Sequence, residues 1–200
     1  GARGDTGEMA ARASRRLVVI AQHKPFSFLS PSTKPLGNKK FAIDLLTLNN
    51  RSNNSKAWDA QSEPRSLPGL TCAGRLDADS TGLMLWSNDH NLIERIIGPR
   101  TTIEKEYLVR VTGHEHWGKA QLADAARWLS DGIMLDGVQL KPAGIEWLNE
   151  SQLRVTLREG RHRQIRRMCE VVGLQVAALK RTRIGCVRLE ALKVGYWKLL

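Results

Sequence analysis

Residues 74–82 place a carboxylate close to a guanidinium, in the run Gly-Arg-Leu-Asp-Ala-Asp-Ser-Thr-Gly. Asp77 follows Arg75 by two positions, and the apolar run Leu83–Trp86 comes next. Such a run after a glycine is typical of a strand entering a core, so Asp77 is expected on the loop just before it. A carboxylate presented on a loop by a rigid sheet can serve as a nucleophile. The alternative is a plain turn in which Asp77 and Asp79 accept hydrogen bonds from backbone N–H groups.

Basic side chains are concentrated in residues 154–188, which hold ten Lys and Arg against two Glu in a chain of formal net charge +11. Arginine suits bidentate phosphate contacts and base stacking, so the segment favours nucleic acid over a membrane surface as a partner. A solvated basic surface is the alternative. The candidate RNA contacts are Arg158, Arg161, Arg163, Arg167, Arg181, Arg183 and Arg188, together with Lys24 and Arg75 outside the segment.

The rest of the chain predicts the elements that must position these residues. Hydrophobic periodicity and turn signals predict helices at 42–48, after Asn88-Asp89, at 116–130 and around 165–172, and strands at 17–21, 83–86, 105–112, 139–148, 152–158, 175–183, 186–190 and 195–199. This mixture predicts an α+β fold with a mixed, mainly antiparallel sheet and flanking helices. Helical spacing puts Arg163 and Arg166 on one face and turns Arg167 away from it.

The composition predicts one domain and excludes several kinds of site. Residues 1–16 lack hydrophobic periodicity and predict a flexible N-terminal arm before a domain at 17–200. Residues 49–68 are rich in Asn, Ser and Pro and predict a long, exposed polar loop. No apolar run is long enough to span a bilayer. The only close histidine pair, His114 and His116, has no third ligand nearby in sequence, and no phosphate-binding glycine motif is present, so we expect no metal and no cofactor.

Several motifs together resemble those of the pseudouridine synthases, most of all the group of RsuA, RluB, RluE and RluF, which isomerise uridines in ribosomal RNA. They follow the family's order over residues 17–199. The motifs are His23-Lys24-Pro25, the run 74–82, Lys105-Glu106-Tyr107-Leu108-Val109, Glu-Gly-Arg-His-Arg-Gln-Ile-Arg-Arg-Met-Cys at 159–169, Arg-Thr-Arg-Ile-Gly at 181–185 and the ending 192–199. The chain departs from the family at Ser27 and His90, where glycine is usual, which puts loop shape in doubt more than chemistry.

The resemblance implies the family's α+β catalytic fold and its reaction, in which the N1–C1′ bond breaks, the detached uracil turns, and its C5 joins C1′. Asp77 is then the catalytic carboxylate, Arg166 the cation paired with it, and Tyr107 the tyrosine that lies against the uracil ring. Arg75 is expected to orient the RNA. The sequence leaves open whether Asp77 attacks C1′ or removes the 2′ proton to give a glycal. Phosphate binding remains the alternative for Arg166, and an ordinary half-buried strand position the alternative for Tyr107.

The resemblance also implies partners. The family usually carries a small S4 domain before the first motif, and with about sixteen residues there we expect none in this chain. We expect ribosomal RNA as the partner, within a pre-ribosomal particle, and a monomer when free, with no membrane and no small-molecule cofactor. The Arg-rich, acid-poor start favours a mitochondrion or similar organelle over a bacterial cytoplasm.

Two other classes of function stay open. One is a glycosidase-like hydrolase with Asp77 and Asp79 as paired carboxylates, although alternation along an extended segment would point these two side chains to opposite sides. The other is a ribosome-assembly factor that binds ribosomal RNA through its basic surface, with catalysis secondary or lost.

Overall fold

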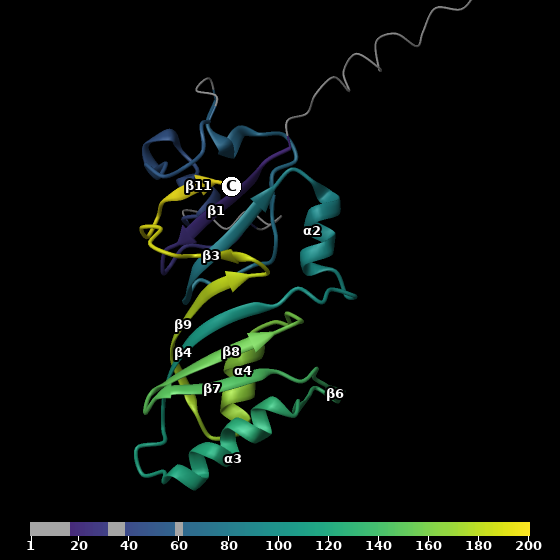
Figure 1. Ribbon diagram of the computed structural model, residues 1–200, viewed down its shortest axis with the longest axis vertical. Coiled ribbons are helices and arrows are strands. Elements are labelled where there is room, and N and C mark those ends of the chain that lie inside the picture. The colour runs from purple at the N-terminus through teal and green to yellow at the C-terminus, as the bar shows by residue number, and fades with distance from the viewer. Residues whose placement is uncertain (1–16, 32–38, 59–61) are drawn as a thin grey trace, which may run out of the picture.

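The computed structural model describes residues 17–31, 39–58 and 62–200, so the predicted arm at 1–16 lies outside the described residues. The strands are β1 (Val19–Lys24), β2 (Thr71–Cys72), β3 (Ser80–Ser87), β4 (Lys105–Thr112), β5 (Met134–Leu135), β6 (Val138–Gln139), β7 (Gly144–Asn149), β8 (Gln152–Leu157), β9 (Gln175–Ile184), β10 (Val187–Arg188) and β11 (Trp197–Leu199). Nine of them form one sheet of order β11-β1-β3-β9-β4-β8-β7, with β2 on β3 and β10 on β9, while β5 and β6 form a separate hairpin (Figure 1). The predicted α+β fold with a mixed, mainly antiparallel sheet is confirmed.

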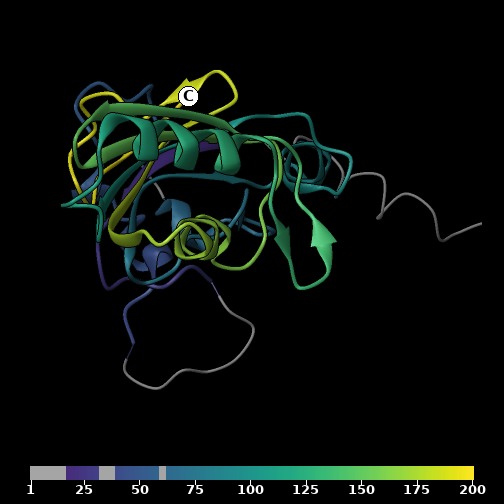
Figure 2. The ribbon, with the colours of Figure 1, turned by 90° about the horizontal axis from the view of Figure 1, so that it is seen from below.

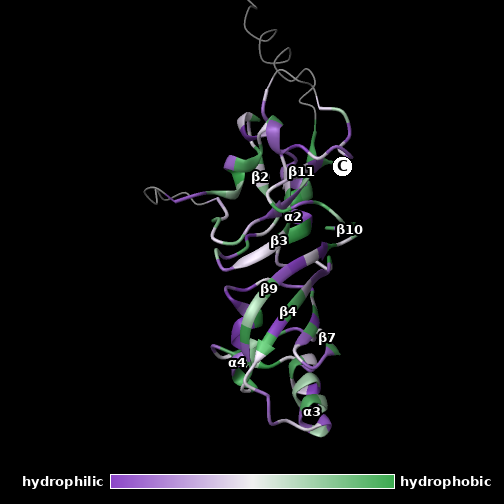
Figure 3. Cartoon of the chain, turned by 90° about the vertical axis from the view of Figure 1, so that its left-hand side faces the viewer, coloured by the Kyte–Doolittle hydropathy of each residue, from purple (hydrophilic) through white to green (hydrophobic). Residues whose placement is uncertain are grey.

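Three α-helices flank the sheet in the described part of the chain: α2 (His90–Ile97), α3 (Lys119–Ser130) and α4 (Gln164–Val171). The Asp89 side chain caps α2, as predicted, by accepting hydrogen bonds from the N–H groups of Asn91 and Leu92. Helix α3 packs beside β7 at one end of the sheet, and α4 lies against β9 (Figures 1 and 2). Hydrophobic and hydrophilic residues alternate along both helices (Figure 3), which is the amphipathic pattern expected of covering helices. Among the described residues no helix is long and apolar enough to cross a membrane.

The predicted helix at 42–48 is confirmed only over Ala42–Leu45, as a short 3-10 helix. The segment forms two short 3-10 turns, Ala42–Leu45 and Leu48–Asn50, because Thr47 between them is extended, with φ −101° and ψ 160°. Leu46 is fully buried at this break. The contact of one leucine with the core therefore overrides the weak helical pattern of the sequence.

The described residues of the polar segment predicted as an exposed loop, 49–58 and 62–68, are mostly exposed, but Trp58 anchors the segment to the core. Trp58 is buried and packs edge-to-face on Trp197, with ring centroids 5.6 Å apart. Its indole N–H donates to the Ser62 carbonyl. Pro64 starts a third 3-10 turn and is also buried. A single tryptophan buries enough apolar area to fix a segment that is otherwise polar.

The contact between β3 and β9 is the one parallel pairing among the named strands of the main sheet. Gly82 of β3 lies opposite Arg181 of β9, and Arg181 lies opposite Tyr107 of β4. Gly82 has φ +108°, and a Cβ at this position would lie 2.2 Å from the Arg181 carbonyl oxygen. Glycine is therefore required for these two strands to approach each other.

Replacing Gly82 with Ala should lower the free energy of unfolding by at least about 3 kcal/mol, at the severe end for single substitutions, because it combines a backbone clash with an unfavourable φ. Urea denaturation followed by tryptophan fluorescence measures this. The matched control is Gly160→Ala, where an added Cβ meets no atom within 4 Å; its effect should stay within about 0.5 kcal/mol. Equal stability of the two variants would contradict the role assigned to Gly82.

Candidate active site

The loop that carries Asp77 lies just before β3, as predicted, and the buried side chain of Arg181 holds it there. The Arg181 guanidinium donates to the carbonyl oxygens of Gly74 at 3.1 Å, Arg75 at 3.4 Å and Leu83 at 2.7 Å. Arg181 is 1% exposed, so in this structure it supports the loop from inside the protein. This placement differs from the prediction that Arg181 contacts RNA.

The start of α4 brings two arginines to the same loop. Arg163 precedes the first turn of α4 in the left-handed conformation, with φ 50°. Its Nη1 lies 3.5 Å from Oδ2 of Asp77 and 3.2 Å from Oδ2 of Asp79. A non-glycine residue held in this conformation indicates a local constraint, and here the constrained residue is the one that contacts both carboxylates.

Arg166 contacts Asp79 instead of Asp77. Its Nη2 lies 3.1 Å from Oδ1 of Asp79 and donates to the Asp79 backbone carbonyl at 3.0 Å. Arg163 and Arg166 thus share a face, as the helical spacing predicts. The cation that contacts Asp77 is Arg163, however, whereas the predicted partner of Asp77 was Arg166. The two carboxylates also lie on one side, because 77–80 form a turn closed by the Ser80 N–H on the Asp77 carbonyl; the expected alternation is wrong. Asp79, for which the family motif implied no role, contacts both arginines.

Burial and neighbouring charges change the ionisation of two groups near Asp77. Partial burial acts to raise the pKa of Asp79, but the charge of Arg166 and the hydrogen bond and charge of Arg163 outweigh it and hold that pKa below its ordinary value. Lys24 is fully buried and its ammonium donates to the Pro25 carbonyl. Its burial lowers its pKa to about 8, with Asp79 and Asp77 acting in the opposite direction. Lys24 is therefore an internal cation in this structure, in contrast to the predicted RNA contact.

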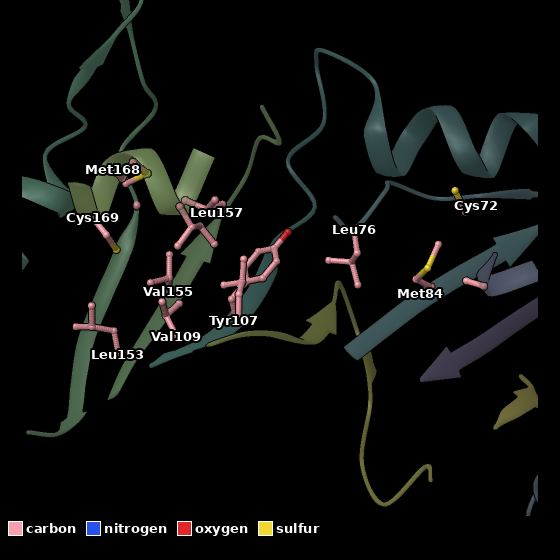
Figure 4. Close-up of a cluster of buried hydrophobic side chains, with 14 of the residues drawn as sticks. Cys72, Leu76, Met84, Tyr107, Val109, Leu153, Val155, Leu157, Met168 and Cys169 are labelled. Carbon is pink, nitrogen blue, oxygen red and sulfur yellow. The ribbon is translucent and has the colours of Figure 1, made fainter. Parts of the chain in front are cut away.

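A cavity of about 200 Å³ opens beside this cluster. At roughly 30 Å³ for each water, it has room for about six or seven waters, or for one planar nucleobase. Its wall combines charged, aromatic and apolar groups from several elements: Arg75, Leu76, Asp77, Ser80, Lys105, Tyr107, Leu157, Arg161, His162, Arg163, Gln164 and Arg181. Tyr107 is 8% exposed, and Figure 4 shows its ring between Leu76 and Leu157. The structure therefore brings Asp77, Tyr107 and Arg163 to one cavity.

Several arginines of the basic segment are paired with carboxylates, some of them distant in the sequence. Arg158 and Arg183 both contact Glu104, at 2.9 and 3.0 Å, and Arg183 also contacts Glu106. The remaining pairs are Arg154 with Glu146, Arg161 with Glu159, and Arg167 with Asp136. Arg75 and Arg188 are exposed and form no ion pair within the described part of the chain. The surface charge of the segment is therefore smaller than its sequence indicates.

No group of three or more His, Cys, Asp or Glu side chains is placed to hold a metal ion in residues 17–31, 39–58 and 62–200. The polar groups that line the cavity are instead several cations, one carboxylate, one phenol, one imidazole, one hydroxyl and one amide. Such a set is suited to binding an anionic ligand and to moving protons.

Comparisons with known proteins agree on one family. The family model described as RNA pseudouridylate synthase matches residues 18–171. The dual-specificity RNA pseudouridine synthase RluF of Escherichia coli K12 is 34% identical over 187 residues, covering 94% of this chain and 56% of that protein. The ribosomal small subunit pseudouridine synthase A of the same strain is 39% identical over 125 residues, covering 61% and 51%. The chloroplast protein SVR1 of Arabidopsis thaliana is 33% identical over 180 residues, covering 86% and 40%. The chain thus spans about half the length of the curated relatives it matches.

Solved structures share the fold. The crystal structure of a pseudouridylate synthase superposes with a TM-score of 0.73 at 27% identity, covering 92% of this chain and 70% of that one. A chain of the archaeal box H/ACA sRNP Nop10-Cbf5 complex reaches a TM-score of 0.54 at 16% identity over 86% of this chain, which is a likeness of fold alone.

Replacing Asp79 with Asn should lower Tm near neutral pH, because the ionised carboxylate binds two guanidinium groups. The pKa of Asp79 is lower in the folded protein than its ordinary value, so this stabilisation is present above about pH 4 and is lost as the pH falls through the folded-state pKa. The difference in Tm between wild type and variant should therefore narrow as the pH is lowered. Asp124→Asn is the control, since its pair with Arg127 is about two-thirds exposed. A difference of constant size down to about pH 3 would contradict this account.

Proposed function

Because this chain belongs to the RNA pseudouridylate synthase family, we propose that it converts a specific uridine of ribosomal RNA to pseudouridine. The observation that carries the proposal is the convergence on one cavity of Asp77, Tyr107 and Arg163, which come from the loop before β3, from β4 and from the start of α4. Fold likeness alone would not support an activity. The convergence supports it because these groups match what the reaction requires.

In this proposal Asp77 acts at the sugar. It either attacks C1′ or removes the 2′ proton, and both routes need an ionised carboxylate. A carboxylate that a bound nucleotide shields from water would take up a proton unless cations favour its charged form. Arg163 contacts Asp77 directly, and Arg166 contacts Asp79, the other carboxylate of the same turn. We assign both arginines to this role, so Arg166 remains part of the proposed catalytic set.

Tyr107 and Arg75 act on the base and on the RNA. The buried Tyr107 ring forms one wall of the cavity, where it would lie against the uracil, with its hydroxyl within the site for removal of the C5 proton. Arg75 is exposed at the cavity and would contact the RNA backbone while the uridine is extruded. The cavity has room for about one base, which agrees with a uridine that leaves its helix before reaction.

We also propose a binding partner and a cellular location for the protein. One relative is named for the ribosomal small subunit, which supports ribosomal RNA as substrate. We propose that the protein meets this RNA within a pre-ribosomal particle and is a monomer when free. Its relatives include a chloroplast protein and proteins of a bacterium, so an organelle or a bacterium fits them, and the mitochondrion remains our prediction from the composition of residues 1–16.

Replacing Asp77 with Asn should abolish pseudouridine formation, with a rate loss of at least about 10⁴-fold, as expected when a reacting group is removed. The change is nearly isosteric, and Tm should move by only a few degrees. The measurement is pseudouridine mapping on transcripts of small- and large-subunit ribosomal RNA incubated with wild type and variant. Asp131→Asn, at the end of α3 and away from the cavity, is the control and should be fully active.

Three outcomes would contradict the proposal. An active Asp77→Asn variant would reassign the reacting group. Release of free uracil by the wild type would indicate a glycosidase-like hydrolase. A wild type that binds the transcripts but changes no uridine would favour the alternative of a ribosome-assembly factor in which catalysis is lost.

RNA binding should depend steeply on salt, because phosphates release counterions when they are neutralised. If about four cations contact phosphates, log Kd should change with log salt with a slope of magnitude near 3. Replacing the unpaired, exposed Arg75 and Arg188 together with Ala should reduce that magnitude to about 1.4, and fluorescence titration of labelled transcripts measures it. Arg127→Ala, on α3 in a pair with Asp124, is the control and should leave the slope unchanged. A slope near zero for the wild type would show that the basic surface does not hold RNA.

A further inference from the structure

Lys105 is a buried cation in the cavity wall without a partner carboxylate. It opens β4, is 4% exposed and lines the same cavity as Asp77 and Tyr107. Its ammonium makes a single long hydrogen bond, 3.4 Å to the Ile103 carbonyl, and forms no ion pair with any described residue. An ammonium group has three protons to donate, so most of its hydrogen-bonding capacity is unused in the free protein.

This burial opposes folding. Removing an ammonium from water costs free energy unless a counter-charge replaces the water. Lys24, the other buried lysine, has Asp79 and Asp77 nearby, which favour its charged form. Lys105 has the reverse surroundings: burial, Arg181 and Lys141 all act in the same direction and together lower its pKa to about 8. A charge kept at such a position is a candidate for contact with a ligand.

The ligand that suits this position is an anionic hydrogen-bond acceptor inside the cavity. In the reaction proposed above, N1 leaves C1′ with both electrons of their bond, so the detached uracil carries a negative charge shared by N1 and its carbonyl oxygens. C5 then supplies the electron pair of the new bond to C1′, C5 loses its proton, and N1 gains one. No oxidant or reductant takes part, and the charge on the base exists only between the two steps.

We propose that the Lys105 ammonium donates a hydrogen bond to a carbonyl oxygen of the detached uracil and stabilises its negative charge while the base turns. Lys105 remains protonated throughout and acts as a fixed donor, in the manner of an oxyanion hole. Asp77 and Lys105 would then contact opposite partners of the broken bond, the sugar and the base. The inference rests on the proposed function and assigns a catalytic residue that the sequence motif alone left without a role.

The direct test is the rate of pseudouridine formation in a single turnover at saturating ribosomal RNA transcript. Lys105→Met should lower this rate by about 10²- to 10³-fold, the typical loss of one such donor, with less than a twofold change in Kd for the RNA. Lys105→Arg keeps a cation and should recover most of the rate. Since Lys105→Met removes an uncompensated buried charge, its Tm should be equal to or higher than that of wild type, whereas a purely structural lysine would give a lower Tm.

The pH dependence provides a second readout. The wild-type rate should fall as the pH rises through about 8, where Lys105 loses its proton, and Lys105→Arg should lack this fall because arginine stays charged. The charged and titratable groups that face Lys105 or share its cavity come from every element around it: Arg181 from β9, Lys141 before β7, Arg75 and Asp77 from the loop, Tyr107 on β4, and Arg161, His162 and Arg163 before α4. Lys141→Met removes one cation from outside the cavity wall and should therefore raise the pKa of Lys105. The rate near neutral pH should stay the same, and the fall in rate should move to higher pH.

The outcomes separate this inference from the proposed function. An active wild type whose rate is unchanged in Lys105→Met overturns the role of Lys105 alone. A variant that only binds RNA more weakly makes Lys105 a phosphate contact and also overturns it. A wild type that forms no pseudouridine overturns the proposed function, and this inference with it.

Discussion

The position of the Asp77 loop depends on the buried guanidinium of Arg181, whose hydrogen bonds hold the backbone on both sides of it. Arg181 lies between Gly82 of β3 and Tyr107 of β4 in the register of three neighbouring strands. Its side chain donates to Gly74, Arg75 and Leu83, so one residue fixes both the loop of Asp77 and the strand of Tyr107. A buried charge is tolerated only when its donors are satisfied, and here backbone carbonyls satisfy them. The absence of a side chain at Gly82 provides the close approach that this arrangement needs.

The permanent charge of Arg181 also affects the rest of the site. It acts to lower the pKa of both buried lysines, Lys24 and Lys105, whereas Asp79 and Asp77 act in the opposite direction on Lys24 only. Asp79 carries part of this balance, because it keeps the guanidinium groups of Arg163 and Arg166 close together despite their repulsion. The resulting excess of positive charge favours the approach of phosphate groups.

Local signals in the sequence predicted the parts of the fold that depend on neighbours in the chain. The Asp89 cap of α2, the strand at 105–112, the loop position of Asp77 and the shared face of Arg163 and Arg166 all follow from spacing over a few residues. Contacts between distant segments were not predictable in this way. Trp58 packs on Trp197, and both Arg158 and Arg183 pair with Glu104. No local pattern in the sequence connects the residues of these contacts. The same is true of the parallel pairing of β3 with β9, which places Arg181 inside the protein.

The site is assembled from two halves of the sheet. The strands β11, β1 and β3 position Asp77, while β4, β8 and the helix α4 position Tyr107 and the arginines, with β9 between the two sets (Figure 1). Three registered pairs, Ser80 with Leu179, Thr81 with Lys180 and Gly82 with Arg181, form the whole ladder that joins β3 to β9. The ladder begins directly after the Asp77 loop, so the distance from Asp77 to the opposite wall is set at the junction itself. A carboxylate on one half can therefore act on a base held by the other half only while this short ladder is intact. The geometry of the reacting groups thus depends on the tertiary fold, because no single motif contains both halves.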